Sequence, residues 1–179
     1  MRVLDRIAAA RIQNGDIQVF EKLIENHQTK VFNYCLRVVN NYHQAEELTQ
    51  DVFVKVYQKI NTYNWRKASL STWIYTITHN TCINSIRSPS LSTSLEQLEL
   101  PGHINSAEDE FLAHERIDEL NKAIQLLPPE ERSLIILKDY LGFKFAEISR
   151  ITSLPIGTLK SRLHSIRTKI RFSIGDNYD

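Results

Sequence analysis

Apolar residues recur every three to four positions along most of this chain, which is the spacing of one face of an α-helix. The segments with this periodicity lie at about 3–14, 16–40, 42–60, 70–87, 106–127, 129–141, 144–151 and 156–171. Turn and capping residues separate them, such as Asn14-Gly15 and Gly142. The pattern therefore predicts an all-α protein.

A stretch of different composition divides these helices into two groups. Residues 89–105 are rich in Ser, Thr, Leu and Glu and contain Pro101-Gly102, a pair that favours turns. Eight acidic residues and one basic residue lie between Glu96 and Glu119. We expect a flexible acidic linker over 89–105. It would join two small helical domains, residues 1–88 and 106–174.

The last predicted helix has the pattern of a helix that reads DNA. Ile156, Leu159, Leu163, Ile166 and Ile170 share one face, which is expected to pack inward. The opposite face carries short polar side chains, and basic side chains flank it on both sides. Small hydrogen-bonding groups between cations suit a helix in a DNA groove. The residues predicted to contact DNA are Thr158, Lys160, Ser161, Arg162, Ser165, Arg167 and Lys169.

The residues before this helix complete a helix-turn-helix. Residues 144–151 form a short amphipathic helix, and Thr152-Ser153-Leu154 form the turn. From Lys144 to Arg171 there are seven basic residues and one acidic residue, a net charge of +6, whereas the whole chain carries only +1. This asymmetry favours DNA binding. A basic, solvated helix that closes a bundle is the alternative on periodicity alone.

A second candidate nucleic-acid surface lies in the first predicted domain. Residues 61–69 combine aromatic, amide and basic side chains without an apolar period, and the next helix carries similar residues on its outward face. Rings stack on unpaired bases, amides bond to base edges and cations neutralise phosphates. The residues predicted to bind a single strand are Tyr63, Trp65, Trp73, Asn80 and Arg87. The alternative is that Trp73 and Tyr75 belong to the core.

The outward face of the third predicted helix has an unusual composition. Glu47, Gln50, Asp51 and Val54 gather there, with an apolar side chain among acids and an amide. Such a face suits docking of another protein. A solvated helix face is the alternative.

Metal, cofactor and catalytic sites lack a sequence signal. His79 and Cys82 are spaced as two ligands on one helix, but no second pair completes a tetrahedral zinc site. The five glycines are scattered, so no phosphate-binding loop is expected. Cys35 and Cys82 belong to no disulfide motif, and no apolar run has the length of a membrane span or signal peptide. We expect no cofactor, no small-molecule substrate and a cytoplasmic location.

Three ordered blocks of this sequence resemble bacterial RNA polymerase sigma factors of the extracytoplasmic-function group, in the sigma-70 family. The blocks are residues 45–57, residues 71–87 with Thr72-Trp73 and Asn80, and Leu127-Pro128 followed by 157–163. Their order and separation also agree, so the resemblance covers nearly the whole chain. It implies a protein without catalysis that confers promoter specificity on core RNA polymerase, in response to envelope or environmental stress.

The resemblance also implies roles for the residues identified above. Glu47, Gln50, Asp51 and Val54 would dock on the clamp helices of the polymerase β′ subunit, and other parts would contact the β subunit. The single-strand residues would hold the melted −10 element with a flipped base. Thr158, Ser161 and Arg162 would read the −35 element, while Lys160, Arg167 and Lys169 would mainly neutralise phosphates. A dedicated anti-sigma factor is a further expected partner.

Some positions depart from the family pattern. Leu70 and Ser71 stand where a Phe and a basic residue are usual, and the promoter loop, residues 61–69, lacks the glycine that is often present there. Ser165 replaces an arginine, which removes one expected phosphate contact. Two other functions stay open: a conventional helix-turn-helix regulator of duplex operators, and a protein-interaction adaptor. Exposed stacking rings at Tyr63 and Trp65 would argue against the regulator.

Overall fold

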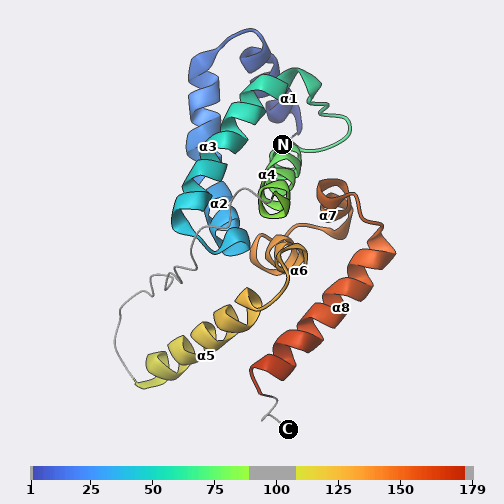
Figure 1. The fold of residues 1–179 in the computed structure, drawn as a ribbon. Helices are drawn as coiled ribbons and strands as arrows, with labels where there is room; N and C mark the ends of the chain where they lie inside the picture. The colour runs from blue at the N-terminus through green and yellow to red at the C-terminus, as the bar shows by residue number, and fades with distance from the viewer. Residues whose placement is uncertain (1, 89–107, 176–179) are drawn as a thin grey trace.

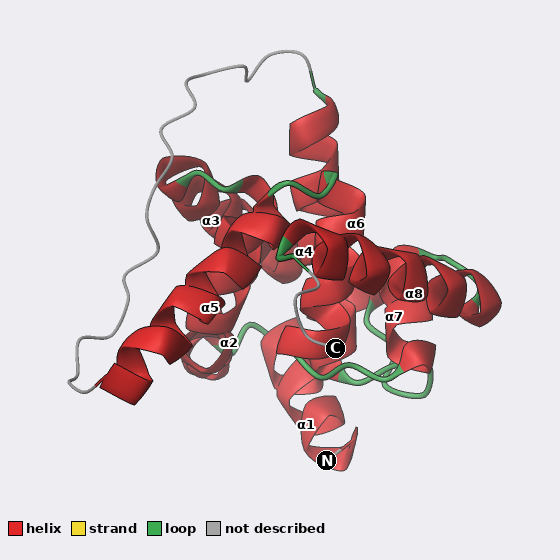
Figure 2. Ribbon diagram, turned by 90° about the horizontal axis from the view of Figure 1, so that it is seen from below, coloured by secondary structure: helices red, strands yellow, loops and turns green. Residues whose placement is uncertain are grey.

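The structure, a computed structural model, describes residues 2–88 and 108–175, and every regular element in these two ranges is helical (Figures 1 and 2). The all-α prediction is confirmed. The predicted linker, residues 89–105, lies outside the described residues. The helices form an N-terminal domain, α1–α4, and a C-terminal domain, α5–α8.

The N-terminal domain follows the sequence pattern closely. Its elements are α1 (Arg2–Gln13), α2 (Ile17–Val39), α3 (Tyr42–Lys59), the 3₁₀ turn η1 (Ile60–Thr62) and α4 (Leu70–Arg87). Side chains just before three helices accept hydrogen bonds from the first helical turn, because those amides lack a partner within the helix. These N-caps are Asp16, Asn41 and Ser69. Local chemistry therefore sets the helix starts.

The C-terminal domain contains the predicted helix-turn-helix. Its elements are α5 (Glu108–Gln125), α6 (Pro129–Ile135), the π-helical turn η3 (Ile136–Tyr140), α7 (Phe145–Thr152) and α8 (Ile156–Ser173). Pro129 occupies the first turn of α6, where its missing N–H costs nothing. Gly142, at φ +71°, and Ser153, at φ +60°, adopt the left-handed conformation that lets the chain turn before and after α7.

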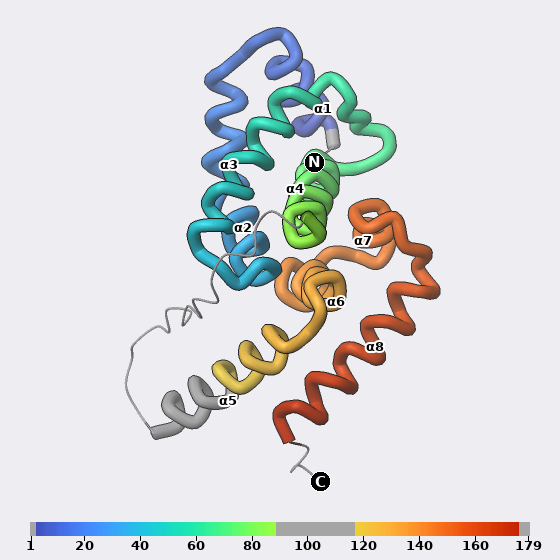
Figure 3. The backbone as a smooth tube through the Cα atoms, viewed as in Figure 1, coloured from blue at the N-terminus to red at the C-terminus, as the bar shows by residue number. Residues whose placement is uncertain are grey.

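The two domains pack against each other and share one continuous cluster of buried apolar residues. Helices α6 and α7 lie against α4, and α6 also contacts α2, while α5 and α8 extend away from the N-terminal domain (Figure 3). The apolar stripe of α8 packs inward as predicted at Leu159, Leu163, Ile166 and Ile170. Ile156 does not: it is 41% exposed, because it begins α8 next to the turn, beyond the contact with α7 and α6.

Candidate nucleic-acid interfaces

The loop between η1 and α4 presents one aromatic ring and buries another. Trp65 is partly buried, and its ring lies near two guanidinium groups: Arg6 at 5.3 Å and Arg66 at 5.4 Å from the ring centroid. Both distances are within the range of cation–π attraction. The predicted stacking residue Trp65 therefore lies in a basic setting, and part of that setting comes from α1.

Tyr63 corrects the sequence prediction of an exposed stacking ring. Only 8% of it is exposed, its ring lies 5.5 Å from that of Trp73, and its hydroxyl donates to the carbonyl oxygen of Ala68 at 3.2 Å. The loop folds back over this ring, so Tyr63 stabilises the loop from inside. The hydrophobic periodicity did not predict the burial of Tyr63, because a residue in a short loop belongs to no helix face.

The outward stripe of α4 is present but is less open than expected. Asn80 and Arg87 are exposed, while Trp73 is partly buried against Tyr63 and the core. Tyr75, on another side of the helix, is a core residue. Trp65, Trp73 and Asn80 thus offer two partly buried rings and an exposed amide.

The C-terminal domain covers the neighbouring face of α4 through a buried polar triad. Ser133 Oγ lies 2.7 Å from Tyr34 Oη and 2.9 Å from His79 Nδ1, and the tyrosine and histidine atoms are 3.1 Å apart. Ser133 and Tyr34 have no exposed surface. Burial lowers the pKa of His79 to about 4, so its imidazole is neutral at neutral pH. Satisfied polar groups of this kind fix one relative position of two helices.

A buried arginine adds a second polar contact between the domains. Arg132 donates to the carbonyl oxygen of Val38 near the end of α2 at 2.8 Å, and to those of Gln125 and Leu127 at 2.7 and 3.0 Å. Burial lowers the pKa of its guanidinium group. The cation lies at the C-terminal end of α2, where the helix dipole favours positive charge. The sequence pattern does not predict this role of Arg132, because nothing in the sequence around it marks a buried cation.

Aromatic and charged contacts border these buried groups. The ring of Tyr75 meets that of Phe143 at 5.0 Å, and Arg37 lies over Tyr140 at 4.1 Å. Arg87, predicted to bind DNA, forms an ion pair with Glu130 of α6. In this closed arrangement, one cation of the single-strand surface is therefore engaged by the C-terminal domain.

The first turns of α8 present an exposed polar and basic face. Lys160, Ser161, Arg162 and Ser165 are exposed on α8, and Thr158 is partly exposed. Ser161 Oγ donates to the carbonyl oxygen of Thr158 at 3.0 Å. These five residues occupy the first three turns of α8, on the side away from its apolar stripe. They form a continuous face that a DNA groove can accept.

The two cations nearer the end of α8 have protein partners. Arg167 holds Asp139 through two hydrogen bonds of 3.1 and 2.7 Å, and this contact raises its pKa. Lys169 lies 2.7 and 2.8 Å from the carboxylate oxygens of Glu131. Both pairs tie α8 to the segment before the helix-turn-helix. The sequence pattern treated these residues as free cations, and the structure places them in ion pairs.

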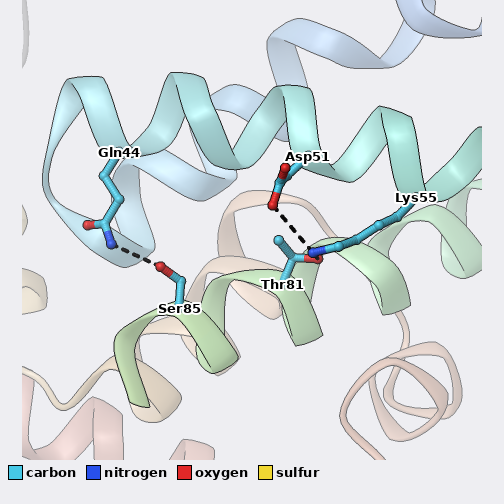
Figure 4. A network of polar contacts seen from close by, with 5 residues as sticks. All are labelled: Gln44, Asp51, Lys55, Thr81 and Ser85. Atoms are coloured by element: carbon cyan, nitrogen blue, oxygen red, sulfur yellow. Dashed lines mark hydrogen bonds and ion pairs between the residues drawn. The ribbon is translucent and has the colours of Figure 1, made fainter. Parts of the chain in front are cut away.

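The predicted docking residues line one groove between α3 and α4. This groove has a volume of about 660 Å³, and its walls include Glu47, Gln50, Asp51 and Val54 together with Asn84 and Ser85 of α4. Hydrogen bonds tie its two walls: Gln44 donates to Ser85 at 3.0 Å, and Lys55 reaches both Asp51 and Thr81 (Figure 4). Val54 is 55% exposed among these polar groups. The structure brings all four residues together on one surface.

His79 and Cys82, weighed above as metal ligands, are engaged separately. His79 belongs to the polar triad, and the Sγ atom of Cys82 lies 3.4 Å from that of Cys35 in the core. Over the described ranges, no group of three or more His, Cys, Asp or Glu side chains is arranged to hold a metal ion. In the same ranges, no helix has the length and apolar character needed to cross a membrane.

Two regions of the chain match known protein families. Residues 23–90 match the family model for Sigma-70 region 2, and residues 117–170 match that for Sigma-70, region 4. The chain is 26% identical to the ECF RNA polymerase sigma factor SigW of Bacillus subtilis, over 98% of this chain and all of that protein. It is 28% identical to the ECF RNA polymerase sigma-E factor of Escherichia coli K12, over 94% and 93%.

Solved structures share the fold. The sigma factor RpoE of Bartonella quintana, solved with the anti-sigma factor NepR, superimposes with a TM-score of 0.71 at 21% identity, over 89% of this chain and 98% of that one. CnrH, solved with the cytosolic domain of CnrY, gives 0.69 at 17% identity, over 93% and 94%. At these identities the likeness concerns the arrangement of helices alone.

Proposed function

Because this chain belongs to the sigma-70 family, in the extracytoplasmic-function group of RNA polymerase sigma factors, we propose that its three surfaces divide promoter recognition among them. As a sigma factor, it confers promoter specificity on bacterial core RNA polymerase and supports transcription initiation. The proposal assigns residues to each step. We also propose that the protein carries out no catalytic step, that it is cytoplasmic and that its domain limits lie near residues 88 and 106.

The observation that carries the assignment is the coexistence of two different nucleic-acid surfaces on one chain. The helix-turn-helix presents an exposed helix face suited to a duplex, whereas the loop at Trp65 and the stripe at Asn80 present rings and an amide suited to unpaired bases. A regulator of duplex operators has no use for the second surface. A sigma factor needs both.

On α8, the exposed residues of the first turns are assigned to the −35 element. Arg162 has a long, exposed side chain whose guanidinium group can pair with a guanine edge through two hydrogen bonds. Thr158 and Ser161 lie on the same face. Lys160 and Ser165 flank them for phosphate oxygens. Arg167 and Lys169 act mainly through their ion pairs, which hold α8 against its neighbours.

In the N-terminal domain, Trp65, Trp73 and Asn80 are assigned to the unpaired −10 strand. Trp65 provides a ring for an unstacked base, and Asn80 provides an amide for a base edge. Arg87 is assigned to a phosphate of the same strand, in competition with its ion pair to Glu130. Tyr63 positions the loop from within and takes no base.

The groove between α3 and α4 is assigned to the clamp helices of the polymerase β′ subunit. Acidic Glu47 and Asp51 beside an exposed Val54 suit a partner helix that carries basic and apolar side chains. Glu47→Lys should therefore weaken binding to core polymerase without unfolding the chain, since the side chain is exposed. Loss of binding to DNA alone would contradict this assignment.

Promoter binding requires the two domains to separate. The −10 and −35 elements are about 25 base pairs apart, roughly 85 Å along B-form DNA at about 3.4 Å per base pair. In the closed arrangement, Ser133 and Tyr34 of the two domains are in hydrogen-bond contact at 2.7 Å. We therefore expect the domains to separate before one chain holds both elements. Binding of core polymerase is the proposed source of the free energy for opening.

A cognate anti-sigma factor is the proposed inhibitory partner. The structural relatives RpoE and CnrH were both solved with such a partner or with the cytosolic domain of a second protein. A partner that binds across the closed domains would stabilise them against opening by mass action. The proposed trigger for its release is envelope or environmental stress.

Transcription in vitro tests the function directly. The chain is added to bacterial core polymerase over genomic fragments, and the 5′ ends of the transcripts are sequenced. We expect defined starts that share two upstream elements and disappear without the chain. Starts that do not depend on the chain, together with tight binding of the isolated protein to duplex fragments, would support the duplex regulator instead.

A further inference from the structure

Helix α1 contacts the promoter loop at its beginning, middle and end. Gln13 Nε2 donates to the carbonyl oxygen of Ile60 at 3.0 Å, where the loop segment begins. Asp5 Oδ2 accepts from the backbone N–H of Leu70 at 3.1 Å, where the segment ends and α4 starts. Between these points, the Arg6 guanidinium lies 5.3 Å from the ring centroid of Trp65. One helix thus holds the whole loop.

The position of Arg6 is not imposed by the core. Helix α1 packs inward through Ala9 and Ile12, which are 3% exposed, whereas Arg6 is exposed. Arg66, from the loop itself, lies 5.4 Å from the same ring. Two cations beside one partly exposed indole form a site of mixed character, with a π-face for a base and positive charge for its phosphate.

We propose that α1 is part of the single-strand site, with Arg6 as a contact to the backbone phosphate of the nucleotide whose base stacks on Trp65. Asp5 and Gln13 are positioning residues, because they fix the two ends of the loop that carries the ring. The proposal rests on the function proposed above and extends its −10 site to a helix that precedes the segment matched to region 2.

The chemistry assigns different roles to the two arginines. A base that stacks on the indole competes with a guanidinium for the ring face, so at least one arginine must move away when the base arrives. A phosphate group of the same nucleotide then pairs with the cation that remains beside the ring. Because Arg6 extends from a helix and Arg66 from the loop, Arg6 has the more firmly positioned backbone and stays beside the ring.

The test uses the full chain in complex with core polymerase. The probe is a fork-junction DNA of the promoter mapped by transcription, duplex upstream and single-stranded across the −10 element. Arg6→Gln and Arg6→Lys form a matched pair that differs mainly in charge. We expect Arg6→Gln to weaken binding about five-fold and Arg6→Lys to restore most of it. The Lys22→Gln variant, an exposed cation on α2, is the control for charge loss.

Salt dependence separates a phosphate contact from a structural role. Log affinity falls with log salt concentration, and loss of one contact to a single strand reduces the steepness of this fall by about 0.7. We expect this decrease for Arg6→Gln and an unchanged slope for Arg6→Lys. An Arg6→Gln complex with the wild-type slope would overturn the proposal, whether or not its affinity falls. Circular dichroism of each variant verifies the fold.

The positioning residues have their own signature. Asp5→Asn and Gln13→Ala should slow opening of a duplex promoter while the salt slope on fork-junction DNA stays at the wild-type value. A changed slope would show that these residues act on the phosphate contact itself, and not only on the position of the loop. If the wild-type complex itself does not bind the fork junction, the proposed function fails. If it binds and Arg6→Gln matches it, only this extension fails.

Discussion

Arg87, the last residue of α4, forms an ion pair with Glu130, the second residue of α6, with 3.2 Å between Nη2 and Oε1. The pair joins a cation assigned to the −10 strand to an acid of the other domain. Domain closure and −10 binding therefore compete for the same guanidinium group.

Removal of this ion pair should have a small effect on closure. Both side chains are well exposed, at 66% and 45%, and such pairs contribute about 1 kcal/mol or less. Glu130→Gln should raise the open population slightly at low salt, measured by fluorescence energy transfer between labels on α3 and α8. Glu131→Gln is the matched control, because its partner Lys169 lies in the same domain. Equal effects from both would show that general charge, and not this pair, controls closure.

Loss of the buried hydroxyl group of Ser133 should have a much larger effect. Ser133→Ala removes the two hydrogen bonds that join the domains in the triad, while the contact between Tyr34 and His79 remains within the N-terminal domain. Each lost hydrogen bond costs about 0.5–1.5 kcal/mol. We expect a larger radius of gyration by small-angle X-ray scattering and faster open-complex formation. Arg132→Met should act in the same direction. A Ser133→Ala chain as compact as the wild type would show that the triad does not control closure.

Closure should weaken as the pH falls. The pKa of His79 is about 4 in the closed structure and about 6.5 when solvated, so between these values the open form binds more protons. Stability of the closed form is complete above about pH 6.5 and decreases towards pH 4, by at most about 1.4 kcal/mol per pH unit.

The carboxylate of Glu130 favours the charged imidazole of His79, while the guanidinium group of Arg87 opposes it. Measurements between pH 5 and 7 cover the upper part of this range. Energy transfer across the domains should decline over this window in the wild type and stay flat in His79→Gln. An imidazole that titrates near 6.5 by NMR in the compact chain would refute the burial argument.

The two arginines of α8 should behave differently. Arg162→Ala should cost roughly 1–3 kcal/mol on the matching −35 sequence and relax specificity there, because its guanidinium is exposed and free to meet a base edge. Arg167→Ala should mainly lower the melting temperature, since it removes the bond to Asp139. Binding across a library of −35 sequences distinguishes the two. A specificity change from Arg167→Ala alone would reverse the assignment.

Replacement of the two aromatic residues of the promoter loop should have different effects. Tyr63→Ala removes a buried ring and should destabilise the N-terminal domain by roughly 3–5 kcal/mol in thermal unfolding. Trp65→Ala should leave the fold largely intact and impair opening of a duplex promoter, with little loss on a template already melted at −10. Equal unfolding of both variants would make Trp65 a core residue as well.

Sequence alone determined the helices and the family. Helix starts depend on caps within three residues, as at Asp16 and Ser69, and the inward stripe of α8 follows from a period of 3.6. Residues such as Glu47 and Val54 were grouped correctly because one helix face places them together. All of these relationships involve residues that are close together in the sequence, so the sequence pattern predicts them.

Only the tertiary structure decided which polar groups far apart in the sequence meet. Tyr34 and Ser133 are 99 positions apart, and Arg167 and Asp139 are 28 apart. No periodicity relates such pairs, because their contact depends on how whole helices assemble around the shared core. The same reason explains the burial of Tyr63 and the position of Arg6 beside Trp65. The closed arrangement, and with it the need for opening, is a property of packing.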